Sequence, residues 1–84
     1  MAVPVAMPRI GQTMTEGTVL SWEKKVGEPV KKGEVLVKIE TDISEFDVVA
    51  EAEGYLLKID ADPEQIVPCG ETIAWIGEKG EQVG

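Results

Sequence analysis

The stretch EGTVLSWEKKVGEPVKKGEVLVKIE, residues 16–40, decides the fold, because a related stretch follows it in the same chain. A shift of 37 residues, without a gap, places it on EGYLLKIDADPEQIVPCGETIAWIG, residues 53–77. The identical pairs are Glu16/Glu53, Gly17/Gly54, Leu20/Leu57, Val30/Val67, Gly33/Gly70, Glu34/Glu71 and Ile39/Ile76. Apolar positions repeat as well, with Val19 opposite Leu56 and Leu36 opposite Ile73. The repeat predicts two related halves that form one domain.

Each half has the pattern of short strands joined by tight turns. A Glu-Gly pair opens it, an apolar stretch follows, and a Gly-Glu pair precedes a second apolar stretch. No segment has the length and the i, i+3, i+4 pattern of an amphipathic helix. The expected strands are residues 3–7, 18–24, 35–40, 45–50, 55–60 and 72–76, with short pieces at residues 29–30 and 66–67.

Alternation along the strands predicts which side chains are buried. It places Leu20 and Trp22 on one face of their strand, and Tyr55, Leu57 and Ile59 on one face of another. Each half has one apolar face that it cannot bury alone. We therefore expect an all-β sandwich or flattened barrel, with two antiparallel sheets packed about a pseudo-two-fold axis.

Composition and charge exclude several function classes. The chain has 84 residues, enough for one small domain. Its net charge of -8 repels nucleic acid and anionic lipid, so we expect neither as a ligand. The clusters Lys24-Lys25 and Lys31-Lys32 are interpreted as exposed turn residues, with contact to a partner as the alternative. No stretch approaches the roughly 20 apolar residues of a membrane-spanning helix, and the start lacks a secretion signal.

The residue types also argue against catalysis and metal binding. The chain has no His, the commonest general base, and neither Ser44 nor Cys69 has an evident partner. One cysteine allows no internal disulfide and no soft metal site, so we expect a half-buried thiol. The sequence predicts no catalytic residue and no metal ligand.

Other chemically active side chains have simpler explanations. The acidic pairs, Asp60 with Asp62 and Glu51 with Glu53, are expected to be solvated surface. Trp22 and Trp75 lie in apolar strand segments, and we expect both to pack in the core rather than to stack on a ligand. The repeated glycines are expected at tight turns or close strand contacts.

The connection ETDISE, residues 40–45, is the informative exception. It joins two expected strands at the junction of the two halves. Asp42 and Ser44 suit a hairpin tip, whereas a β-branched apolar residue does not. Ile43 is therefore expected to be exposed, and the residues alone do not explain why.

The motifs together resemble the lipoyl domain of 2-oxo-acid dehydrogenase acyltransferases, over roughly residues 3–77. In the first half they are MPRIGQTMTEG (residues 7–17), WEKKVG (22–27), VKKGE (30–34) and IETD (39–42). In the second half they are EG (53–54), VPCG (67–70) and IAWI (73–76). The resemblance implies a flattened barrel of two four-stranded antiparallel sheets, and a lipoyl group carried as a swinging arm between active sites.

The resemblance also implies what Ile43 replaces. The family's tip is Glu-Thr-Asp-Lys-Ala, whose lysine forms an amide with lipoic acid, and Ile43 stands at the lysine position, flanked by Asp42 and Ser44. Isoleucine has no amine, so we expect no covalent lipoate or biotin on this chain. Lys38 belongs to the preceding strand and is a poor substitute. The explanations are a deliberate replacement, a naturally degenerate domain kept for its interactions, or a variant in the source.

The remaining expectations follow from the same resemblance. The partners implied are the thiamine-dependent decarboxylase, the acyltransferase core and dihydrolipoamide dehydrogenase, with a lipoate ligase or transferase for a form with lysine at position 43. Residues 1–77 are the expected carrier domain and residues 78–84 the start of a flexible linker or a disordered tail. A bacterial cytoplasm is expected, or a mitochondrial matrix in a eukaryote. The rival hypothesis is an interaction module that uses Ile43 as an apolar anchor.

Overall fold

The computed structural model describes residues 2–81, and these residues form eight β-strands and no helix. The strands match the ranges expected from the sequence to within a few residues at their ends. Their bounds are β1 Val3–Ala6, β2 Glu16–Trp22, β3 Pro29–Val30, β4 Val35–Glu40, β5 Glu45–Val49, β6 Gly54–Ile59, β7 Ile66–Pro68 and β8 Thr72–Gly77.

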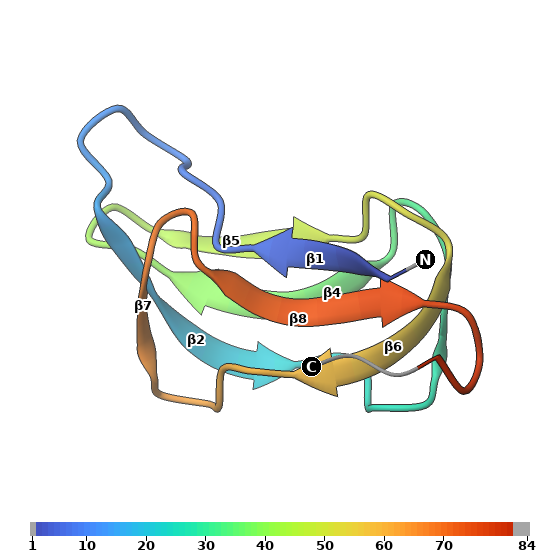
Figure 1. Ribbon diagram of the computed structural model, residues 1–84. Coiled ribbons are helices and arrows are strands. Elements are labelled where there is room, and N and C mark those ends of the chain that lie inside the picture. The colour runs from blue at the N-terminus through green and yellow to red at the C-terminus, as the bar shows by residue number, and fades with distance from the viewer. Residues whose placement is uncertain (1, 82–84) are drawn as a thin grey trace.

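The strands form two four-stranded antiparallel sheets, ordered β1-β8-β6-β3 and β5-β4-β2-β7. Figure 1 shows the sheets as an elongated sandwich, with the β4–β5 hairpin at one end and the end of β8 at the other. The molecule measures 36 × 23 × 21 Å along its principal axes. The predicted all-β fold of two antiparallel sheets is confirmed.

The internal repeat appears in the strand pairing. Strands β2, β3 and β4 of the first half correspond to β6, β7 and β8 of the second, and β5 occupies the place that β1 has in the other sheet. The irregularities correspond too. The β2–β4 register shifts between Val19 and Ser21, and the β6–β8 register shifts between Leu56 and Lys58, at the equivalent positions. The pseudo-two-fold relation therefore extends to the β-bulges.

The prediction of the buried faces was partly wrong, and these bulges are the reason. Val19 and Leu56 have no exposed surface, whereas Leu20, Leu57 and Tyr55 are only half-buried. One extra residue in a strand reverses the alternation beyond it. Trp22 and Ile59, which follow the bulges, do pack against the core as predicted.

The core is made by equivalent positions of the two halves. Its largest fully buried side chains are Met7, Leu36, Ile39, Leu56, Ile73, Ile76, Val19, Val30 and Val37. The prediction that Trp75 is a core residue was wrong. Trp75 is half-buried, and its indole Nε1 donates a hydrogen bond to Asp60 Oδ2 at 3.1 Å.

Five turns share one backbone feature, a positive φ at their third residue. They are residues 25–28, 31–34, 62–65, 68–71 and 78–81, with Gly27, Gly33, Glu64, Gly70 and Gly80 at the third position. In each, the N–H of the fourth residue donates to the carbonyl of the first. Glycine reaches positive φ without steric cost, so the repeated Gly33 and Gly70 are turn residues, as predicted. Their φ angles are 92° and 93°.

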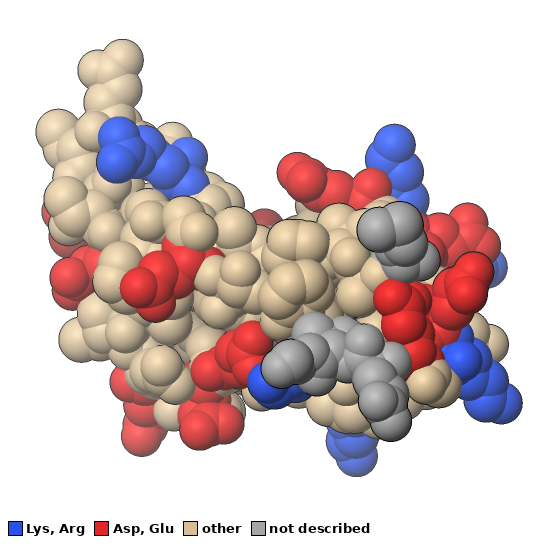
Figure 2. All heavy atoms as spheres, in the orientation of Figure 1, with Lys and Arg blue, Asp and Glu red and all other residues tan. Residues whose placement is uncertain are grey.

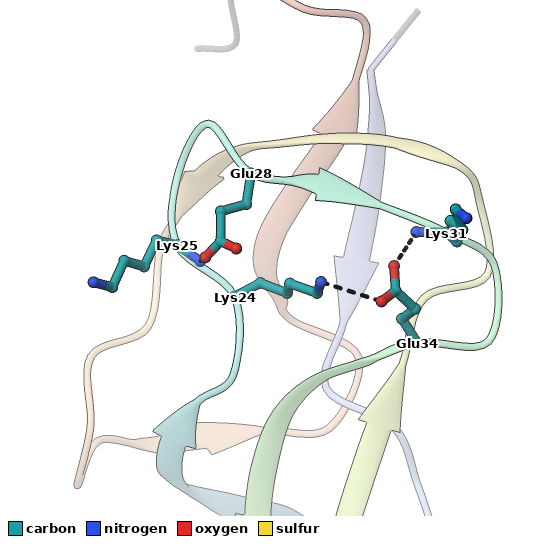
Figure 3. A network of polar contacts seen from close by, with 5 residues as sticks. All are labelled: Lys24, Lys25, Glu28, Lys31 and Glu34. Atoms are coloured by element: carbon teal, nitrogen blue, oxygen red, sulfur yellow. Dashed lines mark hydrogen bonds and ion pairs between the residues drawn. The ribbon is translucent and has the colours of Figure 1, made fainter.

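Four of these turns are closed a second time by a side chain. The carboxylate of Glu28 accepts from the N–H of Lys25, and that of Glu34 from the N–H of Lys31, each at 2.7 Å. Gln65 and Glu81 do the same in the second half. Figure 3 shows Glu34 also reaching the Lys24 ammonium, with Nζ 3.2 Å from Oε2. In the first basic cluster, Glu34 therefore binds the Lys24 side chain and Glu28 binds the Lys25 backbone. In the second cluster, Glu34 binds the Lys31 backbone.

Candidate functional site

The tip of the β4–β5 hairpin projects a single apolar side chain, that of Ile43. Glu40 and Glu45 close the ladder between the strands, and residues 41–44 form the connection. Ile43 is 71% exposed, the largest value among the exposed large hydrophobic residues described. The prediction of an exposed isoleucine at a protruding tip is confirmed.

The Thr41 hydroxyl organises this tip. Its Oγ1 accepts the N–H groups of Ile43 at 3.1 Å and of Ser44 at 3.2 Å, and donates to the Ser44 carbonyl at 3.0 Å. The Thr41 N–H donates to the same carbonyl at 2.9 Å. A hydroxyl has one proton and two lone pairs, so this one is fully used. Sequence reasoning missed Thr41, although threonine two residues before a hairpin apex is a known local acceptor.

The long β1–β2 loop lies beside the tip. Ile43 Cδ1 is 3.8 Å from the point where a Cβ on Gly11 would be. The loop is held at both ends. Gly70 N–H donates to the Met7 carbonyl, and Cys69 N–H to the Thr15 carbonyl, each at 2.9 Å. The Cys69 thiol is half-buried, as expected from the sequence. It is a free thiol, and its Sγ lies 3.6 Å from the Pro8 carbonyl oxygen.

A cleft of about 520 Å³ lies between the loop and the tip, lined by residues 13–18 and 40–42. Its charged residues are Glu16, Glu40 and Asp42, all exposed. General acid–base catalysis needs an acid and a base in different environments, and these three carboxylates are all exposed. The cleft is therefore a polar surface beside the tip.

The charge around the tip is mainly acidic. Glu40, Asp42, Glu45 and Asp47 are exposed on or next to the hairpin. Figure 2 shows acidic side chains at both ends of the visible face, with basic side chains among them, and a largely uncharged area in the middle. Such a field favours a basic partner surface.

The two nucleophile-type side chains considered in the sequence lie in different parts of the fold. Ser44 is exposed at the tip, and Cys69 lies at the foot of the β1–β2 loop. Within residues 2–81, no group of three or more His, Cys, Asp or Glu side chains is placed to hold a metal ion. In the same part of the chain, no helix has the length and apolar character to cross a membrane.

Comparison with known proteins assigns the family. Residues 3–76 match the biotin/lipoyl family model, described as "Biotin-requiring enzyme". The chain belongs to this family. Its fold matches the solution structure of the lipoyl domain of the 2-oxoglutarate dehydrogenase complex from Azotobacter vinelandii, with a TM-score of 0.74 and 36% identity. The match covers 93% of this chain and 99% of that domain, so the chain is a lipoyl-type carrier domain.

Two sequence relatives are larger acyltransferases. The chain is 41% identical over 83 residues to the dihydrolipoyllysine-residue acetyltransferase component of the acetoin cleaving system of Bacillus subtilis (strain 168). It is 42% identical over 76 residues to that of the pyruvate dehydrogenase complex of Mycobacterium bovis. The two alignments cover 99% and 90% of this chain but only 21% and 14% of the two relatives. It corresponds to their carrier domain rather than to their catalytic part.

The lipoyl-domain family carries lipoate, and the exposed apex of this hairpin has no amine. An amide needs an amine on the protein, and the Ile43 side chain has only carbon atoms. The framework of a carrier domain is therefore present with a hydrocarbon side chain at the apex of its tip.

Proposed function

We propose that this chain is the lipoyl-carrier domain of a 2-oxo-acid dehydrogenase acyltransferase, in a form that cannot be lipoylated because Ile43 replaces the attachment lysine. The observation that carries the proposal is the position of Ile43. It is the exposed apex of a hairpin held by a complete hydrogen-bonded tip, in a domain with the family's fold.

Lys38 does not offer an alternative attachment site. It lies within β4, where it pairs with Asp47 of β5 and Ser21 of β2. A side chain in the middle of a sheet strand does not protrude as the apex of a hairpin does. A modifying enzyme that must bring an amine against an activated acyl group needs the protruding position.

The proposal extends to the parent protein. The domain adds no catalytic group. We assign it residues 1–77, with residues 78–84 as the start of a linker or tail; of these, residues 78–81 form a hydrogen-bonded turn and residues 82–84 lie outside the described structure. The partners proposed are the thiamine-dependent decarboxylase, the acyltransferase core and dihydrolipoamide dehydrogenase, in a bacterial cytoplasm. The relatives' membership of pyruvate, 2-oxoglutarate and acetoin systems supports these partners.

The test is intact-mass measurement after incubation with lipoate, ATP and a lipoate ligase. The unmodified chain, Ile43→Lys and Ser44→Lys are compared, the last being a matched control with an amine one residue away from the apex. We expect one lipoyl group on Ile43→Lys, none on the unmodified chain and little on Ser44→Lys. Modification of the unmodified chain would contradict the assignment of position 43.

A second candidate function is supported by the apolar character of the tip. Ile10 in the neighbouring loop is 42% exposed, so the loop and the tip each place an apolar side chain on the outer surface. Single exposed apolar residues are common, so this surface is weaker support than the complete tip. If Ile43→Lys folds normally but gains no lipoyl group, the interaction module becomes the better explanation.

A further inference from the structure

The tip differs from the other tight turns in how it is closed. In the five turns with positive φ, the N–H of the fourth residue donates to the backbone carbonyl of the first. At the tip, the N–H of the fourth residue, Ser44, donates instead to the side chain of the first, Thr41. Across the described residues, no hydrogen bond joins Ser44 N–H to the Thr41 carbonyl, and neither Asp42 nor Ile43 has a positive φ.

The direction of the side-chain bond is also reversed. In the symmetry-equivalent turn, residues 78–81, the Glu81 side chain accepts the N–H of Glu78, so the fourth residue caps the first. At the tip the first residue caps the third and the fourth. One hydroxyl thus takes part in three of the four hydrogen bonds within residues 41–44, whereas each of the other five turns has a backbone bond from its fourth residue to its first.

We propose that Thr41 is a positioning residue that holds position 43 at the apex in the orientation needed for modification. Its hydroxyl fixes the N–H of residue 43 directly and the closing pair of residue 44 at the same time. Without it, the two amides turn to water and the apex samples several conformations. The consequence for modification rests on the proposed carrier function, whereas the consequence for the apex does not.

The first experiment measures the apex in the chain as it stands. Hydrogen exchange of the Ile43 and Ser44 amides is followed by NMR in the unmodified chain, Thr41→Val and Thr41→Ser. Loss of one hydrogen bond at an exposed site corresponds to a threefold to tenfold change in protection. We expect that loss in Thr41→Val, and protection largely restored in Thr41→Ser. Thr72→Val, the same change in β8, is the matched control and should leave both amides unaffected.

The second experiment measures modification in the Ile43→Lys background. Thr41→Val should lower kcat for lipoylation by about tenfold with a smaller change in KM, because the docking surface is retained while the amine is poorly oriented. Thr41→Ser should recover most of the rate, and the melting temperatures of the variants should agree within a few degrees. Equal kcat for Thr41→Val and its parent would overturn the positioning role, even with the carrier function intact.

The two failures are distinguishable. If Ile43→Lys is never lipoylated, the carrier function fails, and the exchange experiment still decides whether Thr41 fixes the apex. Unchanged protection of both amides in Thr41→Val would overturn the inference irrespective of lipoylation.

Discussion

Replacing Glu64 with glycine should stabilise the domain, because Glu64 has a backbone conformation that suits glycine. Its φ is 72°, and it occupies the third position of a turn where the equivalent residue of the first half is Gly27, with φ 96°. Each residue donates its N–H to the facing strand, Glu64 to the Val19 carbonyl and Gly27 to that of Leu56. Glycine would keep that bond and remove the strain.

The expected gain is the difference between two effects. A left-handed conformation costs a residue with a Cβ roughly 1–2 kcal/mol. Glycine gives back about 0.4–1 kcal/mol through the greater freedom of its unfolded chain. Glu64→Gly should therefore stabilise by about 0.5–1 kcal/mol. For a domain of this size that raises the melting temperature by roughly 2–8 °C.

The assay is urea unfolding with a charge control. Glu64→Ala removes the same charge but keeps a Cβ at positive φ, so it should gain much less than Glu64→Gly. Gly27→Ala, the opposite change at the equivalent position, should lose about 1 kcal/mol. If Glu64→Gly and Glu64→Ala have equal stability, the gain comes from charge relief, and the reasoning from φ is refuted.

Two further predictions concern Gly54 in β6 and Glu34 in the turn before β4. Gly54→Ala should destabilise by about 2 kcal/mol, measured by urea unfolding, because its Cβ would lie 2.6 Å from the Gly77 carbonyl oxygen and push β6 from β8. The Lys31 N–H and the Lys24 ammonium lower the pKa of Glu34, so its charged form stabilises the fold at neutral pH, and this contribution is lost as the pH falls below 4.5 towards the lowered pKa. The stability difference between the unmodified chain and Glu34→Gln should therefore shrink over that range in denaturation series. A constant difference would contradict the assignment, and Glu53→Gln controls for loss of an exposed charge.

The fold was largely predictable because the repeat carries information about long-range pairing. Two copies of one pattern imply equivalent strands, and equivalent strands in one domain imply two related sheets. The repeated Gly33 and Gly70 located turns for the same reason. The exposure of Ile43 was also predictable, because the residue stands at the tip of a hairpin, where apolar residues are unusual.

The buried faces were not predictable from alternation alone. The bulges at Val19–Ser21 and Leu56–Lys58 shift the register within an apolar run in which neighbouring residues are equally apolar. Hydropathy therefore cannot show which of two adjacent leucines turns inward. The repeat predicts only that equivalent positions behave alike, as Val19 and Leu56 do, since both are fully buried.

Departures from the internal symmetry separate two kinds of residue. Glu64 makes the same backbone hydrogen bond as its counterpart Gly27, but it has a Cβ at a positive φ. The difference therefore adds only backbone strain, which Glu64→Gly should relieve. The tip differs from its counterpart, residues 78–81, in the route of its hydrogen bonds and in the residue that provides the cap. A symmetric framework needs only one such rearrangement to build a protruding apex at one place. On this argument, Thr41 and position 43 form one functional unit, and a lysine restored at position 43 should be modified at its full rate only while the Thr41 hydroxyl is present.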